Sequence, residues 1–261
     1  MPTGLGPVCL RRTPHFGDCA VRGATSGRDA MASARHGFHV APHYARRDGL
    51  AAVAMLRLTK SRGRRMTQFT NRYTAAVDYA RVAHASQVKK GTSIAYLSHL
   101  LGVSSLVIDY GGDEDQAIGG LLHDVIEDCG AQHEERVRQN FGEKVIRIVL
   151  ACTDGTAQSK AEFATPEDPR QEWEDRKRRY LAHLVDVDDD ALLVSGCDKL
   201  HNLRAIAADL ANPEIGDAVF SRFKGGSDGT RWYYAQLVEQ YRRRGHPAIR
   251  ELQQALSLLQ S

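Results

Sequence analysis

The segment "LLHDVIEDCG" (residues 121–130) places four polar or charged side chains directly after two leucines. On one helix, His123 and Glu127 lie four residues apart, as do Asp124 and Asp128, so all four would share one broad face. Three neighbouring carboxylates repel one another, which weakens an isolated helix by roughly a few tenths of a kcal/mol per pair. A divalent cation bound by these groups would reverse that repulsion.

Imidazole together with carboxylate suits Mn, Fe, Zn or Ni better than an all-oxygen calcium site. The alternative for this segment is a solvated acidic helix face without a ligand. The complete HDxxED pattern, set between apolar residues, favours the metal site over that alternative.

Two distant segments offer the remaining ligands. In "DYARVAHAS", His84 lies on an apolar helix face, where a lone histidine is also common as a hydrogen-bonded core residue. In "VSGCDKLHNLRAI", Asp198 follows a hydrophobic run, and a carboxylate on the apolar side of a helix is costly without a partner. The pattern therefore predicts a site in which positions stay open for water and substrate. Its four expected metal ligands are His84, His123, Asp124 and Asp198.

The elements that must position these side chains are helices, because apolar residues recur at helical spacing almost throughout from Thr70 onward. Asp113, three residues ahead of Gln116, gives a capping-box signature, and Gly130 marks the end of that helix. Strand signals are nearly absent, and we expect loops at 154–169 and 222–230. Helices are expected over 73–84, 96–110, 113–130, 132–140, 143–152, 170–186, 189–211, 229–243 and 247–259. The sequence predicts an all-α fold, a single bundle of about eight helices.

Residues 1–65 differ in charge from the rest of the chain. Eleven arginines and one lysine oppose three aspartates there, a formal charge of +9, whereas residues 66–261 carry −6. The helical part is thus acidic, which argues against a nucleic-acid binder with a basic face. We expect 1–65 to be an Arg-rich extension and 66–261 the functional domain. Three interpretations of the extension stay open: a disordered tail, a targeting peptide, or translated upstream sequence before a true start at Met66.

The cellular setting is indicated by hydropathy and cysteine usage. The mean hydropathy is −0.41, and no apolar run approaches the length of a membrane span. Five scattered cysteines without CxxC spacing are typical of a reduced compartment. We therefore expect a cytoplasmic protein without a membrane or nucleic-acid partner. Its state of homo-oligomerisation is left open.

The order H…HD…D resembles the signature of the HD-domain metal-dependent phosphohydrolases. Over about residues 70–245, the chain more closely resembles the hydrolase domain of RelA/SpoT-type proteins and the small alarmone hydrolases. The segments that carry this resemblance are "AHASQVKKGTSIAYLSHLLGV", "LLHDVIEDCG", "FGEKVIRIVLACTDG", "WEDRKRRYLAHL", "CDKLHNLRAI" and "WYYAQLV".

The resemblance implies a function. The reaction of this family removes pyrophosphate from the 3′ position of ppGpp or pppGpp, usually with Mn²⁺. It implies that Glu127 and Asp128 orient and deprotonate the attacking water, and that the four ligands predicted above hold the metal. The residues expected to bind the nucleotide are Lys89, Lys90, His99, Asn202 and Arg204.

This chain departs from the family pattern at the basic pair. The family usually has Arg-Lys where this chain has Lys89-Lys90, and the arginine is expected to lie over the purine. Lysine has no planar guanidinium, so the resemblance leaves the choice of purine open. Ala95 and Leu100 replace two prolines that carry no chemistry.

Two other functions compete with the alarmone hydrolase. One keeps the metal site and hydrolyses another nucleotide. The other is a non-catalytic alarmone-binding module, and the complete ligand set and Glu127-Asp128 speak against it.

Overall fold

A computed structural model describes the fold for residues 67–153 and 169–260. Within these ranges the chain is all-α, as predicted, and its only β feature is an isolated bridge between Val88 and Ala95. The extension 1–65 and nearly all of the loop expected at 154–169 lie outside the described residues. The division of the chain at Met66 therefore stays a prediction.

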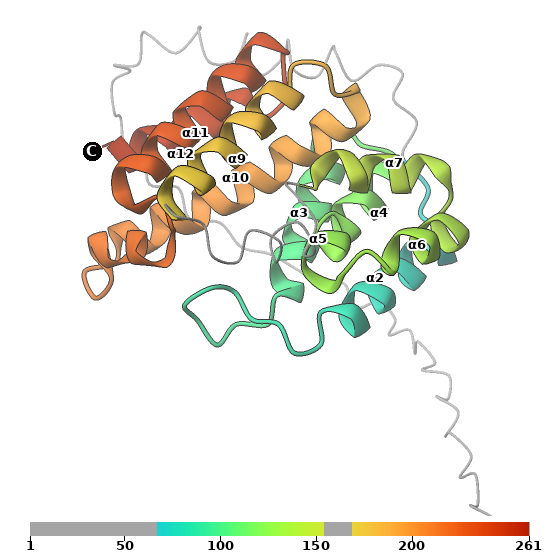
Figure 1. Cartoon of the computed structure of the whole chain (residues 1–261). Helices are drawn as coiled ribbons and strands as arrows, with labels where there is room; N and C mark the ends of the chain where they lie inside the picture. The colour runs from blue at the N-terminus through green and yellow to red at the C-terminus, as the bar shows by residue number, and fades with distance from the viewer. Residues whose placement is uncertain (1–66, 154–168, 261) are drawn as a thin grey trace, which may run out of the picture. The chain divides into compact units, whose positions relative to one another are not determined.

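The helices fall into two successive groups along the chain (Figure 1). The first group is α2 Asn71–Ala83, α3 Leu97–Asp109, α4 Glu114–Leu122, α5 Val125–Cys129, α6 His133–Phe141 and α7 Glu143–Cys152. The second is α9 Pro169–His183, α10 Asp189–Ala211, the 3-10 helix η1 Gly216–Arg222, α11 Gly226–Arg243 and α12 Ile249–Gln260.

The long helix α10 joins the two groups. It packs against α3, α4 and α7 of the first group and against η1, α11 and α12 of the second (Figure 1). Consequently, a side chain on the inner face of α10 can meet side chains from α3 and from the end of α4.

The hydrophobic core has three parts. One cluster fills the first group, with Leu100 and Ile126 fully buried, and a larger one fills the second around Tyr241. A third cluster, which includes Val103 and Val194, lies where α3, α7 and α10 meet. Burial of each such side chain contributes roughly 1.5–3 kcal/mol, so this junction is well anchored.

The segment expected as one helix over 113–130 is two helices separated by a turn at His123-Asp124. The expected caps are present: Asp113 and Gln116 form a reciprocal capping box, and Gly130 ends α5 with φ +110°. The interruption has a local cause, because the imidazole of His123 bonds back to the carbonyl of Gly120. The turn directs both side chains inward toward α10.

Two further differences concern the second group. The 3-10 helix η1 was not expected, since a seven-residue element has too few positions for a periodic signal. Helix α11 begins at Gly226, within the segment expected as a loop. Among the described helices, none combines the length and the apolar character that a bilayer crossing requires.

Candidate metal centre and substrate cavity

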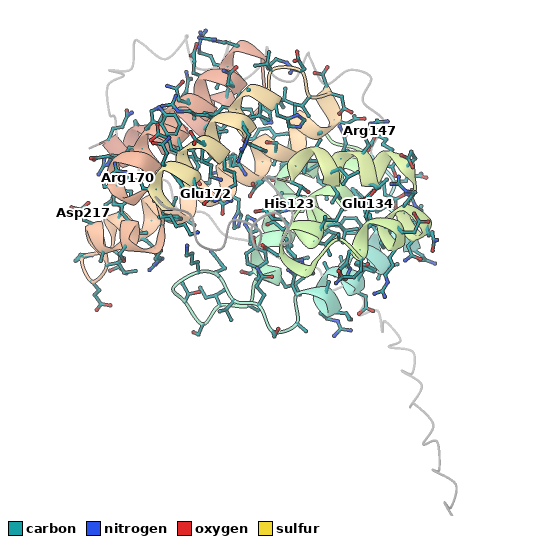
Figure 2. The ribbon with its side chains drawn as sticks, viewed as in Figure 1. His123, Glu134, Arg147, Arg170, Glu172 and Asp217 are labelled. Carbon is teal, nitrogen blue, oxygen red and sulfur yellow. The ribbon has the colours of Figure 1, made fainter. Side chains whose placement is uncertain are left out.

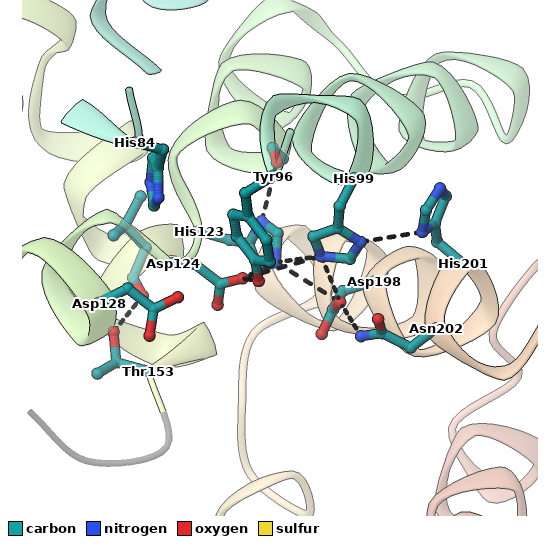
Figure 3. A network of polar contacts seen from close by, with 12 residues as sticks. His84, Tyr96, His99, His123, Asp124, Asp128, Thr153, Asp198, His201 and Asn202 are labelled. Atoms are coloured by element: carbon teal, nitrogen blue, oxygen red, sulfur yellow. Dashed lines mark hydrogen bonds and ion pairs between the residues drawn. The ribbon is translucent and has the colours of Figure 1, made fainter. Parts of the chain in front are cut away.

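Four side chains from three parts of the fold converge at the junction (Figure 3). His99 comes from the first turn of α3, His123 and Asp124 from the turn between α4 and α5, and Asp198 from α10. Nε2 of His123 lies 3.0 Å from Oδ2 of Asp124 and 3.5 Å from Oδ1 of Asp198. Nε2 of His99 lies 3.2 Å from the same Oδ1 and 3.8 Å from the same Oδ2. Two imidazole nitrogens and two carboxylate oxygens thus face one another.

Both histidines turn Nε2 into this cluster because Nδ1 is engaged elsewhere. Nδ1 of His123 lies 2.9 Å from the carbonyl oxygen of Gly120, which can only accept, so this nitrogen carries the proton. Nδ1 of His99 lies 2.9 Å from Nδ1 of His201. Burial lowers the pKa of His123, but the charges of Asp124 and Asp198 outweigh it and raise that pKa well above its usual range. A bound cation would displace the proton from Nε2, and this nitrogen would then offer its lone pair, as metal-binding histidines do.

The cluster is buried and strongly polar. The exposed fractions are 2% for His99, 1% for His123 and 4% for Asp198. His123 is labelled near the middle of the view in Figure 2. Asp198 accepts hydrogen bonds from Lys199 at 2.5 Å and from Asn202 at 2.6 Å. Burial raises the pKa of Asp198, but the charges of Lys199 and His123 outweigh it and hold the pKa well below its usual range. Asp198 is therefore a buried anion.

Asp124 is held in a similar way. Its Oδ2 accepts a hydrogen bond from the hydroxyl of Tyr96. Burial raises the pKa of Asp124, yet the charge of His123 and its hydrogen bond lower it below the usual range. Burial and the charge of Asp124 raise the pKa of Tyr96 far above its usual value, so the phenol stays a donor.

The donor set fits a divalent transition-metal ion. Two carboxylates and two imidazoles match the mixed nitrogen and oxygen ligands that such ions prefer. His99, His123 and Asp124 offer ligand atoms that all lie within 4.8 Å of one another. Burial of two carboxylates at one point is costly, and a bound cation would compensate both.

The structure brings together three of the four expected ligands, His123, Asp124 and Asp198, and puts His99 where His84 was expected. The imidazole of His84 is buried at the end of α2, where Nδ1 donates to Oε1 of Gln87 at 2.6 Å. The ring of His84 packs against the ring of Tyr96, with centroids 5.4 Å apart. The ring of His99, on α3, also packs against Tyr96, with centroids 5.2 Å apart. His84 therefore has the surroundings of a hydrogen-bonded core histidine.

The expected water-activating pair lies on α5, beside the cluster. Asp128 is exposed and accepts a hydrogen bond from Nε2 of Gln87 at 2.9 Å, so His84, Gln87 and Asp128 form a continuous chain of hydrogen bonds. Glu127 is half-buried on the same short helix. Because α5 begins directly after Asp124, this helix holds both carboxylates close in sequence to a residue of the cluster.

A cavity of about 850 Å³ adjoins the cluster and is lined by Tyr96 and His99. Two acidic side chains, Glu172 and Asp209, contribute to its wall. The basic lining residues are Lys89, Lys90, Arg176, Lys177, Lys199, Arg222 and Lys224. An acidic domain thus contains a locally cationic cavity, which suits an anionic, phosphate-rich ligand.

Four of the expected substrate-binding residues, Lys89, Lys90, His99 and Asn202, line this cavity. Arg204 is exposed on α10 and is not among the described residues of its wall. The reason is helical geometry, because a residue two positions after Asn202 points about 200° away around the helix axis.

The site predicted from the sequence does not include three residues that contact the cluster, Tyr96, Lys199 and His201. A signal was present for two of them. Lys199 follows Asp198 directly, and His201 stands three residues after Asp198, on the same face of α10. Tyr96 carried no signal, because its contact with Asp124 depends on how the segment before α3 folds.

Comparisons with known proteins place these residues in a family. The HD domain matches residues 76–223. The chain is 33% identical over 131 residues to a probable guanosine-3′,5′-bis(diphosphate) 3′-pyrophosphohydrolase of Synechocystis. The matched region covers 50% of this chain and 16% of that protein. It is 33% identical over 132 residues to the guanosine-3′,5′-bis(diphosphate) 3′-pyrophosphohydrolase MESH1 of Xenopus tropicalis, which covers 49% of this chain and 66% of that protein.

A solved structure described as "A metazoan ortholog of SpoT hydrolyzes ppGpp and plays a role in starvation responses" is also similar. It is 26% identical, has a TM-score of 0.46 and covers 69% of this chain and 98% of that chain. The HD-domain match spans more than half of the present chain and includes all four residues of the cluster. The chain belongs to the HD domain family, whose divalent-metal dependence agrees with the donor set described above.

Proposed function

We propose that this protein is a metal-dependent phosphohydrolase that removes pyrophosphate from the 3′ position of ppGpp and pppGpp. The observation that carries the proposal is the buried cluster of two imidazoles and two carboxylates beside a cavity with seven basic side chains. The names of the similar Synechocystis and Xenopus proteins support this substrate.

The proposed metal ligands are His99, His123, Asp124 and Asp198, with His99 in place of His84. We propose Mn²⁺ as the ion, because mixed imidazole and carboxylate donors suit it. When bound, such an ion lowers the pKa of a coordinated water from 15.7 toward about 7 and polarises a phosphoryl oxygen.

The attacking water is oriented and deprotonated by Glu127 and Asp128. Water attacks the phosphorus bonded to the ribose 3′ oxygen, and the bond between that phosphorus and that oxygen breaks. The ribose oxygen keeps the electron pair and takes up a proton, and the base accepts the proton of the attacking water. From ppGpp the products are GDP and pyrophosphate.

The cationic cavity binds the two diphosphate groups of the substrate. Lys199 and Asn202 each contact Asp198 and line the cavity, so they stand between the cluster and the substrate. Lys89 and Lys90 add positive charge, which stabilises the anionic diphosphate and the charge that develops during its release.

Hydrolysis of another nucleotide is the second candidate function. One observation favours it. The basic pair that lines the cavity is Lys89 and Lys90, and neither lysine has a planar guanidinium that could stack on guanine. The choice between ppGpp, pppGpp and ppApp is therefore the part of the proposal that most needs a direct comparison.

The test uses the full chain, Mn²⁺ and a nucleotide panel that contains ppGpp, pppGpp and ppApp, with products identified by ion-exchange chromatography. Release of GDP and pyrophosphate from ppGpp supports the first function. Inertness toward ppGpp together with turnover of other nucleotides would replace it with the second. Binding of ppGpp in the presence of Mn²⁺ without any cleavage would point to a regulatory module.

We also propose a cytoplasmic location, where nucleotide substrates are made. Cys129, Cys152 and Cys197 are free thiols in the described part of the chain, which agrees with a reducing compartment. Whether the protein forms homo-oligomers is testable by light scattering.

A further inference from the structure

We propose that His201 is the positioning residue that fixes the ring and the tautomer of His99, and thereby determines how tightly the metal is held. This inference rests on the function proposed above, in which Nε2 of His99 is a ligand. His201 itself stands outside the group of donors and acts through His99.

The hydrogen bond between the two rings sets the tautomer. The Nδ1 atoms of His99 and His201 are 2.9 Å apart, with ring centroids 4.8 Å apart and planes inclined by 66° (Figure 3). Two imidazole nitrogens at this distance share one proton, so one must donate and the other accept. For Nε2 of His99 to offer a lone pair to a metal, neutral His99 must carry its proton on Nδ1. His201 therefore accepts, and His99 donates.

The ring of His201 lies against the backbone of α3, in the space left open by the missing side chain of Gly102, which we call the seat. A Cβ atom added at Gly102 would lie 2.3 Å from Nε2 and 2.5 Å from Cδ2 of His201. The imidazole thus rests directly on the backbone of α3, one turn after His99. Any larger residue at position 102 would push the ring away and lengthen the hydrogen bond to His99.

Helix α10 carries Asp198, which belongs to the cluster, and His201, which orients His99. Asp198 and His201 are three residues apart on α10, so they lie on one face at a fixed spacing. Helix α10 therefore controls Asp198 directly and His99 through His201. This explains how ligands from α3 and α10, about a hundred residues apart in sequence, keep one geometry.

Mn²⁺ binding to the full-length protein, measured by isothermal titration calorimetry, tests the inference without any substrate. The His201→Leu variant removes the acceptor at similar volume, and we expect the dissociation constant to rise by about 10–100-fold, as for other outer-shell partners of metal ligands. The His201→Asn variant should bind almost as tightly as wild type, because its Oδ1 can accept where Nδ1 stands. His183→Leu, an exposed histidine change on α9, is the control and should leave the affinity unchanged.

A double-mutant cycle tests the seat at Gly102. Gly102→Ala should weaken Mn²⁺ binding in the wild-type background and have no further effect in a His201→Ala background, where the space is free. Alanine favours a helix more than glycine does, so loss of helix propensity does not explain the effect. Circular dichroism on every variant separates lost folding from lost affinity.

The outcomes separate the two claims. Tight Mn²⁺ binding by the wild type with unchanged affinity in His201→Leu would overturn the role of His201 and leave the proposed function standing. An equal effect of Gly102→Ala in both backgrounds would also overturn it. Failure of the wild-type protein to bind Mn²⁺ would overturn the proposed function and this inference together.

Discussion

The hydroxyl of Tyr96 donates a hydrogen bond to Oδ2 of Asp124, the same oxygen that lies 3.0 Å from Nε2 of His123. A residue from the segment before α3 thus orients the carboxylate that α4 and α5 present to the cluster. Because the pKa of Tyr96 is raised by burial and by Asp124, the phenol remains a donor across the physiological range.

Removal of that donor should weaken the metal site without dismantling it. For Tyr96→Phe, we expect about 10–100-fold weaker Mn²⁺ binding, because hydrogen-bond partners of a metal-binding carboxylate orient it. Calorimetric titration measures the affinity, and circular dichroism checks the fold. An unchanged affinity would show that Asp124 needs no orienting partner. Tyr79→Phe, which removes the hydroxyl that pairs with His133 on α6, is a matched control.

Loss of the proposed base should separate metal binding from turnover. For Glu127→Gln we expect normal Mn²⁺ affinity and a kcat lower by roughly 10²–10⁴, the usual contribution of a general base. The measurement is steady-state hydrolysis of ppGpp at saturating Mn²⁺. If Glu127→Gln retained nearly the full rate, the assignment of proton transfer to this residue would be wrong.

A buried chain of hydroxyls in the second group of helices should contribute to stability. Ser195 Oγ lies 2.7 Å from the hydroxyls of both Tyr180 and Tyr241, and all three residues are buried. Ser195→Ala leaves two buried phenols without their shared partner, which we expect to lower the free energy of unfolding by about 1–3 kcal/mol. Urea denaturation measures this loss.

Ser257→Ala is the matched control for Ser195→Ala. Its hydroxyl bonds to the carbonyl of Gln254 on the exposed face of α12, so we expect a change within about 0.5 kcal/mol. Equal effects of the two substitutions would contradict the role given to the buried chain.

The pH dependence of stability should be set in part by His246, between α11 and α12. Its exposed fraction is 1%; Nε2 donates to the carbonyl of Leu193, and Nδ1 accepts from the amide of Ala248. Burial lowers the pKa of His246 from 6.5 to about 4. The folded state thus keeps His246 neutral between pH 6.5 and about 4, whereas the unfolded state binds a proton there.

The stabilisation from neutral His246 is fully present above pH 6.5 and is lost as the pH falls toward 4. Its size is on the order of 3 kcal/mol. Urea denaturation at pH 7.5 and pH 5 should show a smaller loss of stability on acidification for His246→Asn than for wild type. The difference isolates this residue from the other histidines, and an identical pH dependence in both proteins would contradict the assignment.

The sequence was sufficient to predict the helices and much of the cluster, because these depend on local rules. Apolar periodicity gave the all-α class, and the Asp113 capping box and Gly130 gave the limits of the α4 and α5 segment. The cost of burying a carboxylate pointed to Asp198 from its apolar neighbours alone.

Local sequence rules did not show that His99, and not the expected His84, would lie in the cluster. Both histidines lie on or beside apolar helix faces, and both are buried in the structure. What separates them is tertiary. The segment between them folds back through the bridge of Val88 with Ala95, which brings the start of α3, and not the end of α2, against α10. His201 was missed for a related reason, since its role depends on the room left by Gly102 on another helix.

The central claim is that His99, His123, Asp124 and Asp198 hold one divalent ion, and the most direct test is the number of Mn²⁺ ions bound per chain. We measure it by equilibrium dialysis and elemental analysis for the wild type, His99→Ala and His84→Ala. The account predicts one ion for the wild type and for His84→Ala, and none for His99→Ala at the same free concentration. Retention of the ion by His99→Ala with its loss from His84→Ala, or no bound ion in the wild type, would contradict the account.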